Sequence, residues 1–288
     1  MEIKSHSNDF PSTFSQIPQI PIRSPIEIIE NLHSVYNEKR IEKFRDVLDS
    51  LRSDPRFDIR DLDTIMIDAI RHDNTRFTEE LLSHGLPLVP GYALEATQSK
   101  ARNVLEMFFE KGWDINHPIS GAQPPLLSFV YLDQEMMVWL LDRGANPNQR
   151  CEIDLTPLSY YVKYAPISNI KILLNRGGRI DQGQLLFHAL ERKSEVIEVL
   201  QLLLREGASL NTMMYQNHYP SWRLYYFMGL GTVLHKAAEM GNVEAVSFLV
   251  HEGIDLGKED VNGRTALQCA KMFNKVEVVK VLEDALKH

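Results

Sequence analysis

Cysteine is scarce in this sequence: its 288 residues include only Cys151 and Cys269. Two cysteines cannot build a disulfide framework or a zinc site of several thiolates. Long apolar runs are also missing, since no stretch approaches the roughly 18 residues that a membrane helix needs. The N-terminus lacks the charged segment followed by an apolar run that a secretory signal has. We therefore expect a cytoplasmic or nuclear chain with no inserted membrane segment, bound metal or cofactor.

Basic residues are outnumbered, with 31 Lys and Arg against 39 Asp and Glu, which gives a net charge of −8. A general nucleic-acid binder needs a cationic face to displace phosphate counterions, so we expect no direct contact with nucleic acid. The His-Glu-x-x-His and Gly-x-Ser-x-Gly patterns of hydrolytic enzymes are absent as well. The sequence predicts no catalytic residue, and the chain is not expected to be an enzyme.

A recurring pattern is what the sequence does contain. An apolar pair followed by a glycine closes successive segments, and the glycines are Gly85, Gly112, Gly144, Gly177, Gly207 and Gly253. Their spacings are 27, 32, 33, 30 and 46 residues. All but the last lie near one unit of about 33 residues, the period at which short helix pairs stack into a solenoid.

The segments also share an opening motif, seen in "TPLSYYV" (Thr156–Val162), "PPLLSFV" (Pro124–Val130) and "TALQCAK" (Thr265–Lys271). Threonine is suited to cap a helix, and proline fits the first helical position because its missing N–H has no partner there. A closing glycine such as Gly253 supplies the positive φ of a helix C-terminus. Each unit is therefore predicted to be a pair of helices.

These motifs resemble those of the ankyrin-repeat family, most closely in "GTVLHKAAEMGNVEAVSFLVHEGIDL" and "NGRTALQCAKMFNKVEVVKVLEDAL". The resemblance implies an all-α solenoid of about seven helix pairs. We predict a disordered, proline-containing tail over residues 1–25 and a divergent helical capping unit over residues 26–60. The ankyrin array is then expected over residues 61–288.

One segment, residues 212–231, breaks the repeat and explains the 46-residue spacing, which exceeds one unit by about 13 residues. It is the most aromatic stretch of the chain, with Tyr215, Tyr219, Trp222, Tyr225, Tyr226 and Phe227. The rings either pack on the neighbouring repeats or form a contact surface, because Tyr and Trp dominate binding hot spots. The two interpretations are compatible.

The resemblance also implies a function: a scaffold or adaptor that binds a protein partner through its concave face and finger tips, here together with the aromatic insert. A finger is the loop that connects two helix pairs and projects past the helices. By position, the finger tips carry Gln149, Arg150, Glu152, Lys258 and Asp260. The first helices present Tyr160, Tyr164, Lys236, Met240 and Phe273. The insert adds Tyr215, Tyr219, Trp222, Tyr225 and Tyr226 to this predicted partner-binding set.

Two alternatives remain open at this stage. One is an enzyme or small-ligand site in a pocket between the insert and the repeat groove, using His218, Trp222, Arg223 or Tyr225, because a fold never determines function by itself. The other is an assembly subunit whose insert is a permanent interface. A deep, partly polar pocket under the insert would favour the first alternative, and a broad exposed aromatic patch would favour a protein partner.

Overall fold

The computed structural model describes residues 23–287 of the chain. These residues form two compact units, one built from residues 23–69 and 74–87, and the other from residues 70–73 and 88–287. The predicted tail over residues 1–25 lies almost wholly outside the described residues. The proposed boundaries of the capping unit and the array stay a prediction.

The first unit contains α1 (Ile26–Asn37), α2 (Ile41–Leu51), the 3-10 turn η1 (Ile59–Leu62), α4 (Thr75–Ser83) and most of α3 (Asp63–Arg71). Three edge-on rings lie in its core, with Tyr36 and Phe44 at centroid distances of 4.9 and 5.3 Å from Phe77. The buried Ser24 hydroxyl donates to Oδ2 of Asp61 at 2.6 Å. That bond joins the start of α1 to η1 and fixes where the described chain enters the unit.

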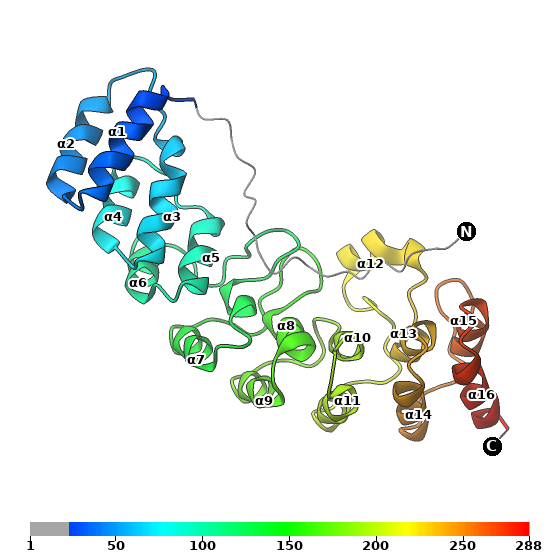
Figure 1. Cartoon of the computed structure of the whole chain (residues 1–288). Helices are drawn as coiled ribbons and strands as arrows, with labels where there is room; N and C mark the ends of the chain where they lie inside the picture. The colour runs from blue at the N-terminus through cyan, green and yellow to red at the C-terminus, as the bar shows by residue number, and fades with distance from the viewer. Residues whose placement is uncertain (1–22, 288) are drawn as a thin grey trace. The chain divides into compact units, whose positions relative to one another are not determined.

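The second unit is a stack of helix pairs (Figure 1). Its elements are α5 (Pro90–Gln98), α6 (Arg102–Glu110), η2 (Leu126–Phe129), α7 (Gln134–Asp142), α8 (Pro157–Tyr164), α9 (Ile167–Asn175), α10 (Leu185–Leu190), α11 (Val196–Arg205), α12 (Tyr219–Tyr225), η3 (Tyr226–Met228), α13 (Val233–Met240), α14 (Val243–His251), α15 (Ala266–Met272) and α16 (Val276–Ala285). Residues 23–287 contain no strand, only two isolated bridges in loops.

In neighbouring pairs, first helices pack on first helices and second helices pack on second helices. The first helices α8, α10, α13 and α15 pack in succession, and the second helices α11, α14 and α16 form a parallel row. The second helices bury a residue of their closing apolar pair, such as Leu173, Leu203 and Leu249, all at 0% exposure. In a solenoid, each unit buries its apolar stripe against its neighbours. The predicted all-α helix-pair fold is therefore confirmed.

Helix ends follow the predicted chemistry. The backbone N–H of Thr156 donates to Ser159 Oγ at 3.1 Å, while the Ser159 N–H donates to Thr156 Oγ1 at 3.3 Å, which is a reciprocal capping box. Thr232 and Thr265 begin α13 and α15 in the same way. Gly253 adopts a φ of 80°, as a residue following a helix C-terminus must where the chain turns left-handed.

The Thr156→Ala substitution is expected to lower the free energy of unfolding by about 1 kcal/mol, because it removes the cap of α8 in a buried position. Urea unfolding followed by circular dichroism measures the loss. Ser247→Ala is the matched control, since its exposed hydroxyl only back-bonds to the Val243 carbonyl within α14. Equal stability of the Thr156 variant and this control would contradict the capping role.

Candidate functional site

The insert over residues 212–231 is a folded element and not an open loop. It contains α12 and η3, and Figure 1 shows α12 on the side of the first helices α10 and α13. The ring of Tyr215 stacks on Tyr225 at 5.3 Å with an interplanar angle of 25°. Burial, together with the neighbouring Tyr225, raises the pKa of Tyr215. These two half-buried rings therefore pack against each other within the insert.

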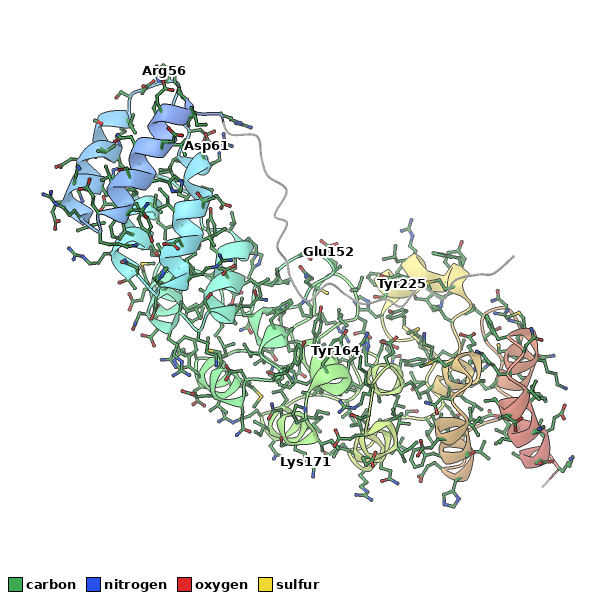
Figure 2. All side chains as sticks on the ribbon, viewed as in Figure 1. Arg56, Asp61, Glu152, Tyr164, Lys171 and Tyr225 are labelled. Carbon is green, nitrogen blue, oxygen red and sulfur yellow. The ribbon has the colours of Figure 1, made fainter. Side chains whose placement is uncertain are left out.

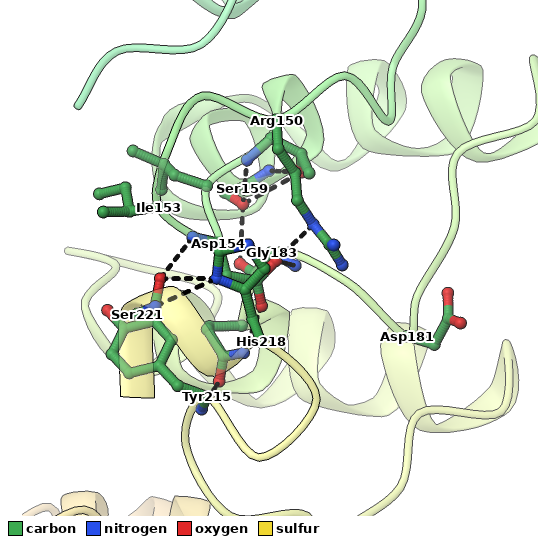
Figure 3. A network of polar contacts seen from close by, with 12 residues as sticks. Arg150, Ile153, Asp154, Ser159, Asp181, Gly183, Tyr215, His218 and Ser221 are labelled. Carbon is green, nitrogen blue, oxygen red and sulfur yellow. Dashed lines mark hydrogen bonds and ion pairs between the residues drawn. The ribbon is translucent and has the colours of Figure 1, made fainter. Parts of the chain in front are cut away.

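The buried carboxylate of Asp154, 3% exposed, organises the base of the insert (Figure 3). Its Oδ1 accepts the Gly183 N–H at 3.0 Å and lies 2.8 Å from Nε of Arg150, while Oδ2 accepts a hydrogen bond from Gln184 Nε2. The same Gln184 side chain accepts the backbone N–H of Tyr215 at 3.0 Å. One finger, the start of α10 and the insert are thus held by a single carboxylate.

Glycine is required at position 183 in this network. Gly183 has a φ of 73°, and a Cβ there would lie 2.4 Å from Ser159 Oγ and 2.6 Å from Thr156 Oγ1. The close approach lets Ser159 Oγ donate to the Gly183 carbonyl at 2.7 Å. The cap of α8 and the Asp154 network therefore share this glycine, so a larger residue would disturb both.

The insert is attached to the finger by the fully buried Ser221 of α12. Its Oγ accepts the backbone N–H of Asp154 at 2.8 Å and donates to Nδ1 of His218 at 2.9 Å. Nδ1 also accepts the Ser221 N–H at 3.3 Å, which makes His218 the N-cap of α12. Burial lowers the pKa of His218, and a neutral imidazole with an acceptor at Nδ1 suits both donors.

The outer face of the insert is aromatic and exposed. The exposed fraction is 67% for Tyr219, 37% for Trp222 and 52% for Tyr226. These three rings form one stacked row, which we call the aromatic row, with centroid distances of 6.3 Å from Tyr219 to Trp222 and 5.7 Å from Trp222 to Tyr226. Tyr215 and Tyr225 are half-buried while the aromatic row faces solvent, and the use of the row as a contact surface stays a prediction.

A second aromatic cluster lies on the first-helix side of the array. Tyr160 contacts Phe129 at 5.5 Å and Tyr164 at 6.1 Å, and Tyr131 stacks on Tyr164 at 5.3 Å. Burial raises the pKa of Tyr160 to about 12, whereas Tyr164 is 38% exposed and is marked in Figure 2. Sequence reasoning missed Phe129 and Tyr131, although two aromatic residues just after "PPLL" are a usable signal.

A charged cluster borders these tyrosines. Oε2 of Glu191 lies 2.8 Å from Nζ of Lys163 and 3.5 Å from Nδ1 of His188, and its Oε1 lies 4.0 Å from Nζ of Lys236. Burial opposes ionisation of Glu191, but hydrogen bonds from His188 and Lys163 hold its pKa at about 2. Lys236, a predicted partner-binding residue, thus lies at the edge of an ion-pair network.

The finger before α8 carries three of the predicted site residues. Glu152 is exposed (Figure 2) and its backbone N–H donates to the Gly121 carbonyl at 3.0 Å. Arg150 is committed to Asp154, and Gln149 Nε2 donates to the Arg150 carbonyl at 3.3 Å. Only Glu152 offers a mostly uncommitted side chain to a partner from this finger.

The finger between α14 and α15, which carries Lys258 and Asp260, differs most from the predicted exposure of its side chains. Asp260 is 5% exposed, and its carboxylate accepts from Nε and Nη2 of Arg264 at 2.9 and 2.7 Å. Lys258 is half-buried, and its Nζ donates to the Asn211 carbonyl at 2.7 Å. The structure therefore corrects the expectation for Asp260: its side chain shapes the finger and is not available to a partner.

Met240 and Phe273, at the ends of α13 and α15, are 42% and 46% exposed. Both cysteines are buried, and burial raises the pKa of each thiol, so neither presents a reactive surface thiolate. Among the described residues no group of three or more His, Cys, Asp or Glu side chains is arranged to hold a metal ion.

The residues suggested for a pocket under the insert either contact other side chains or are exposed. Nδ1 of His218 is occupied by Ser221, and Tyr225 is stacked on Tyr215, which leaves Trp222 and Arg223 exposed. A cavity of about 440 Å³ lies elsewhere, lined by Glu106, Phe109, Glu110, Trp113, Asp114, Ile115 and Arg143. Across residues 23–287, none of the helices has the length and apolarity that a membrane span needs.

Comparison with known proteins agrees with this architecture. Residues 222–286 match a family model that is described as ankyrin repeats (3 copies). The chain is similar to the B-cell lymphoma 3 protein homolog of Mus musculus, with 28% identity over 151 residues that cover 49% of this chain and 30% of that protein. It is also similar to the ankyrin repeat protein nuc-2 of Neurospora crassa, with 27% identity over 167 residues that cover 57% of this chain and 14% of that protein.

The chain spans less than a third of the length of either relative. The fold defines a helical repeat protein, and ankyrin repeats are found in residues 222–286, as the motifs there predict. Ankyrin repeats generally bind proteins and do not catalyse reactions.

The Ser221→Ala substitution is expected to loosen the insert, because it leaves the buried Asp154 N–H without its acceptor, at a cost of about 1–3 kcal/mol. Hydrogen exchange of the amides in residues 212–231 should accelerate about tenfold or more. The exposed Ser209→Ala variant, three residues before the insert, serves as control. Unchanged exchange in the Ser221 variant would show that the insert is held by other contacts.

The pKa of His218 is expected to lie below its ordinary value of 6.5, because burial disfavours the imidazolium and Ser221 donates two hydrogen bonds to Nδ1. Contacts that need neutral His218 are present above pH 6.5 and weaken as the pH falls below it. Titration of the His218 ring protons by NMR measures this pKa. Removal of one donor in Ser221→Ala should move it upward, and a wild-type value above 6.5 would contradict the assigned network.

Proposed function

We propose that this chain is a protein-interaction scaffold that binds a partner through the first-helix face of the second unit, its exposed finger positions and the aromatic row. One observation carries the proposal: Tyr219, Trp222 and Tyr226 are exposed together on an element that is anchored through the buried, hydrogen-bonded Ser221. Large exposed rings on a rigid support lose little conformational entropy on binding.

The tyrosine cluster supports the same proposal. Tyr164 offers an amphipathic ring on the first-helix face, with Met240 and Phe273 further along the array. Tyrosine and methionine are enriched in interface cores. Glu152 on the preceding finger adds an exposed carboxylate, which favours a partner that presents basic groups there, and the net charge of −8 acts in the same direction.

The remaining expectations follow from this role. A protein partner and not nucleic acid is proposed because the chain carries an excess of carboxylates. We place this interaction in the cytoplasm or nucleus. The contribution of each named residue to binding belongs to the proposal, with Asp260 left out because its carboxylate is buried and Arg150 because it is paired with Asp154.

The proposal is tested by quantitative affinity purification from extracts of the source cells with the wild-type chain and a Trp222→Ala, Tyr226→Ala variant. At least one protein should be depleted about tenfold or more by the variant, since central aromatic residues carry most interface energy. Removing exposed rings should leave the thermal melting of the chain unchanged within the error of surface substitutions.

Leu224→Ala is the matched control, because Leu224 is 53% exposed on the same helix and lies roughly opposite the row by helical periodicity. It should retain every protein that the wild-type chain captures. Identical sets of captured proteins from the wild type and the double variant would contradict the role of the insert. A matching Tyr164→Ala variant then tests the first-helix face separately.

A further inference from the structure

The end of the insert lies against the finger between α14 and α15. The backbone N–H of Val261 in this finger donates to the carbonyl of the buried Leu230 at 3.0 Å. Gly229, with a φ of 77°, approaches the finger so closely that a Cβ on it would lie 2.6 Å from Nη2 of Arg264 and 2.9 Å from Nδ2 of Asn262. The insert is therefore held by a second finger, in addition to the finger before α8.

Asp260 and Arg264 fix the shape of this second finger. Oδ1 of Asp260 accepts the backbone N–H groups of Asn262 and Arg264 at 2.8 and 2.9 Å, and Oδ2 accepts from the guanidinium. Burial opposes ionisation of Asp260, but hydrogen bonds from Arg264 and from the backbone hold its pKa below the ordinary value. The guanidinium that lies against Gly229 is therefore kept in one place by a buried, fully bonded carboxylate.

His235 of α13 connects the same finger to the last residue of the insert. Its Nε2 lies 3.0 Å from the Arg264 carbonyl, and its Nδ1 accepts the backbone N–H of Thr232 at 3.1 Å. A Cβ on Gly231 would lie 2.5 Å from Cγ of this imidazole. Burial lowers the pKa of His235, and the neutral ring with its proton on Nε2 suits both contacts. The exit of the insert thus packs against both α13 and the finger.

The two ends of the insert are also joined to each other, because the backbone N–H of Met214 donates to the Gly231 carbonyl at 2.9 Å. Between these ends, Ser221 Oγ accepts the Asp154 N–H of the finger before α8. The first helices pack in the order α8, α10, α13, α15, so the two fingers belong to helix pairs that are not neighbours. Units of a solenoid contact only their neighbours, and the insert is an exception to that rule.

The aromatic row lies between these two attachments. Tyr219 and Trp222 are placed by α12, whose first turn is bonded through Ser221. Tyr226 begins η3, which ends directly before Gly229. Since the centroids of Trp222 and Tyr226 are 5.7 Å apart, a shift of η3 at the exit would separate the two rings. The geometry of the row therefore depends on the finger between α14 and α15 as well as on the finger before α8.

We propose that Asp260 and Arg264 are positioning residues for the aromatic row, and that the insert is a strap, a segment bonded at two places, across the pairs from α8–α9 to α15–α16. The inference rests on the proposed function, and it adds two residues that place the contact surface without touching a partner. A partner that binds only the stacked row would in turn stabilise the finger between α14 and α15, because binding favours whatever the bound arrangement requires.

The first test compares Gly229→Ala with Gly253→Ala by hydrogen exchange of the full chain. The two glycines have φ values of 77° and 80°, so the backbone strain of an added Cβ is similar. Only the Cβ at position 229 meets the Arg264 guanidinium, whereas position 253 has no atom within 4 Å. Exchange of the amides in α12 and η3 should be about tenfold faster in Gly229→Ala than in Gly253→Ala.

Arg264→Ala tests the pair itself, because it removes the guanidinium from above Gly229. It should also accelerate exchange in α12 and η3 about tenfold, and shift the NMR signal of the Trp222 indole N–H. The signals of Trp113 and Trp139, the other two tryptophans, are internal references and should stay in place. A finger that serves only its own helix pair would loosen α15 and leave the insert and the Trp222 signal unchanged.

Unchanged exchange in α12 and η3 in both Gly229→Ala and Arg264→Ala would overturn the inference. If this happens while the Trp222→Ala, Tyr226→Ala variant still loses a captured protein, the scaffold function stands and only the positioning role fails. If both variants loosen the insert while the Trp222→Ala, Tyr226→Ala variant captures every protein, the strap stands and the use of the row as a contact surface fails.

Discussion

The buried carboxylate of Asp154 is the interaction on which the candidate site depends. It joins a finger, the entry to α10 and, through Gln184 and Ser221, the insert that follows α11. A charge without water is costly unless it is paired and fully hydrogen-bonded, and here Arg150 and two N–H donors satisfy it. Loss of any one partner therefore affects three segments at once.

This arrangement explains how a 20-residue interruption of the repeat can present rings to solvent in one conformation. Ser221 and His218 hold the first turn of α12 on the finger side, and Tyr215 stacks against Tyr225 beneath the helix. Tyr219, Trp222 and Tyr226 are then left on the opposite side, stacked on one another. Rigid support and exposed apolar area are separate requirements of a recognition surface, and different residues of the insert meet them.

Local sequence signals were sufficient for the repeat because each reflects a short-range constraint. Thr156 beside Pro157 predicts a helix start, and a reciprocal box forms there. Gly253 predicts a left-handed turn after α14, with the φ observed. The exception is "PPLLSFV", whose first helix is reduced to the 3-10 turn η2.

The sequence alone determined the period, the helix pairs, the position of the insert and its aromatic character, because these depend on spacing and on residue type within one unit. Only the tertiary structure decided which polar side chains are available. Asp260 and Arg150 occupy finger positions that a repeat pattern marks as exposed, yet each is paired in a buried network. Phe129 and Tyr131 join Tyr160 and Tyr164 although about 30 residues separate them in the chain. Burial and pairing depend on what the neighbouring unit and the insert place against a side chain, and no local pattern carries that information.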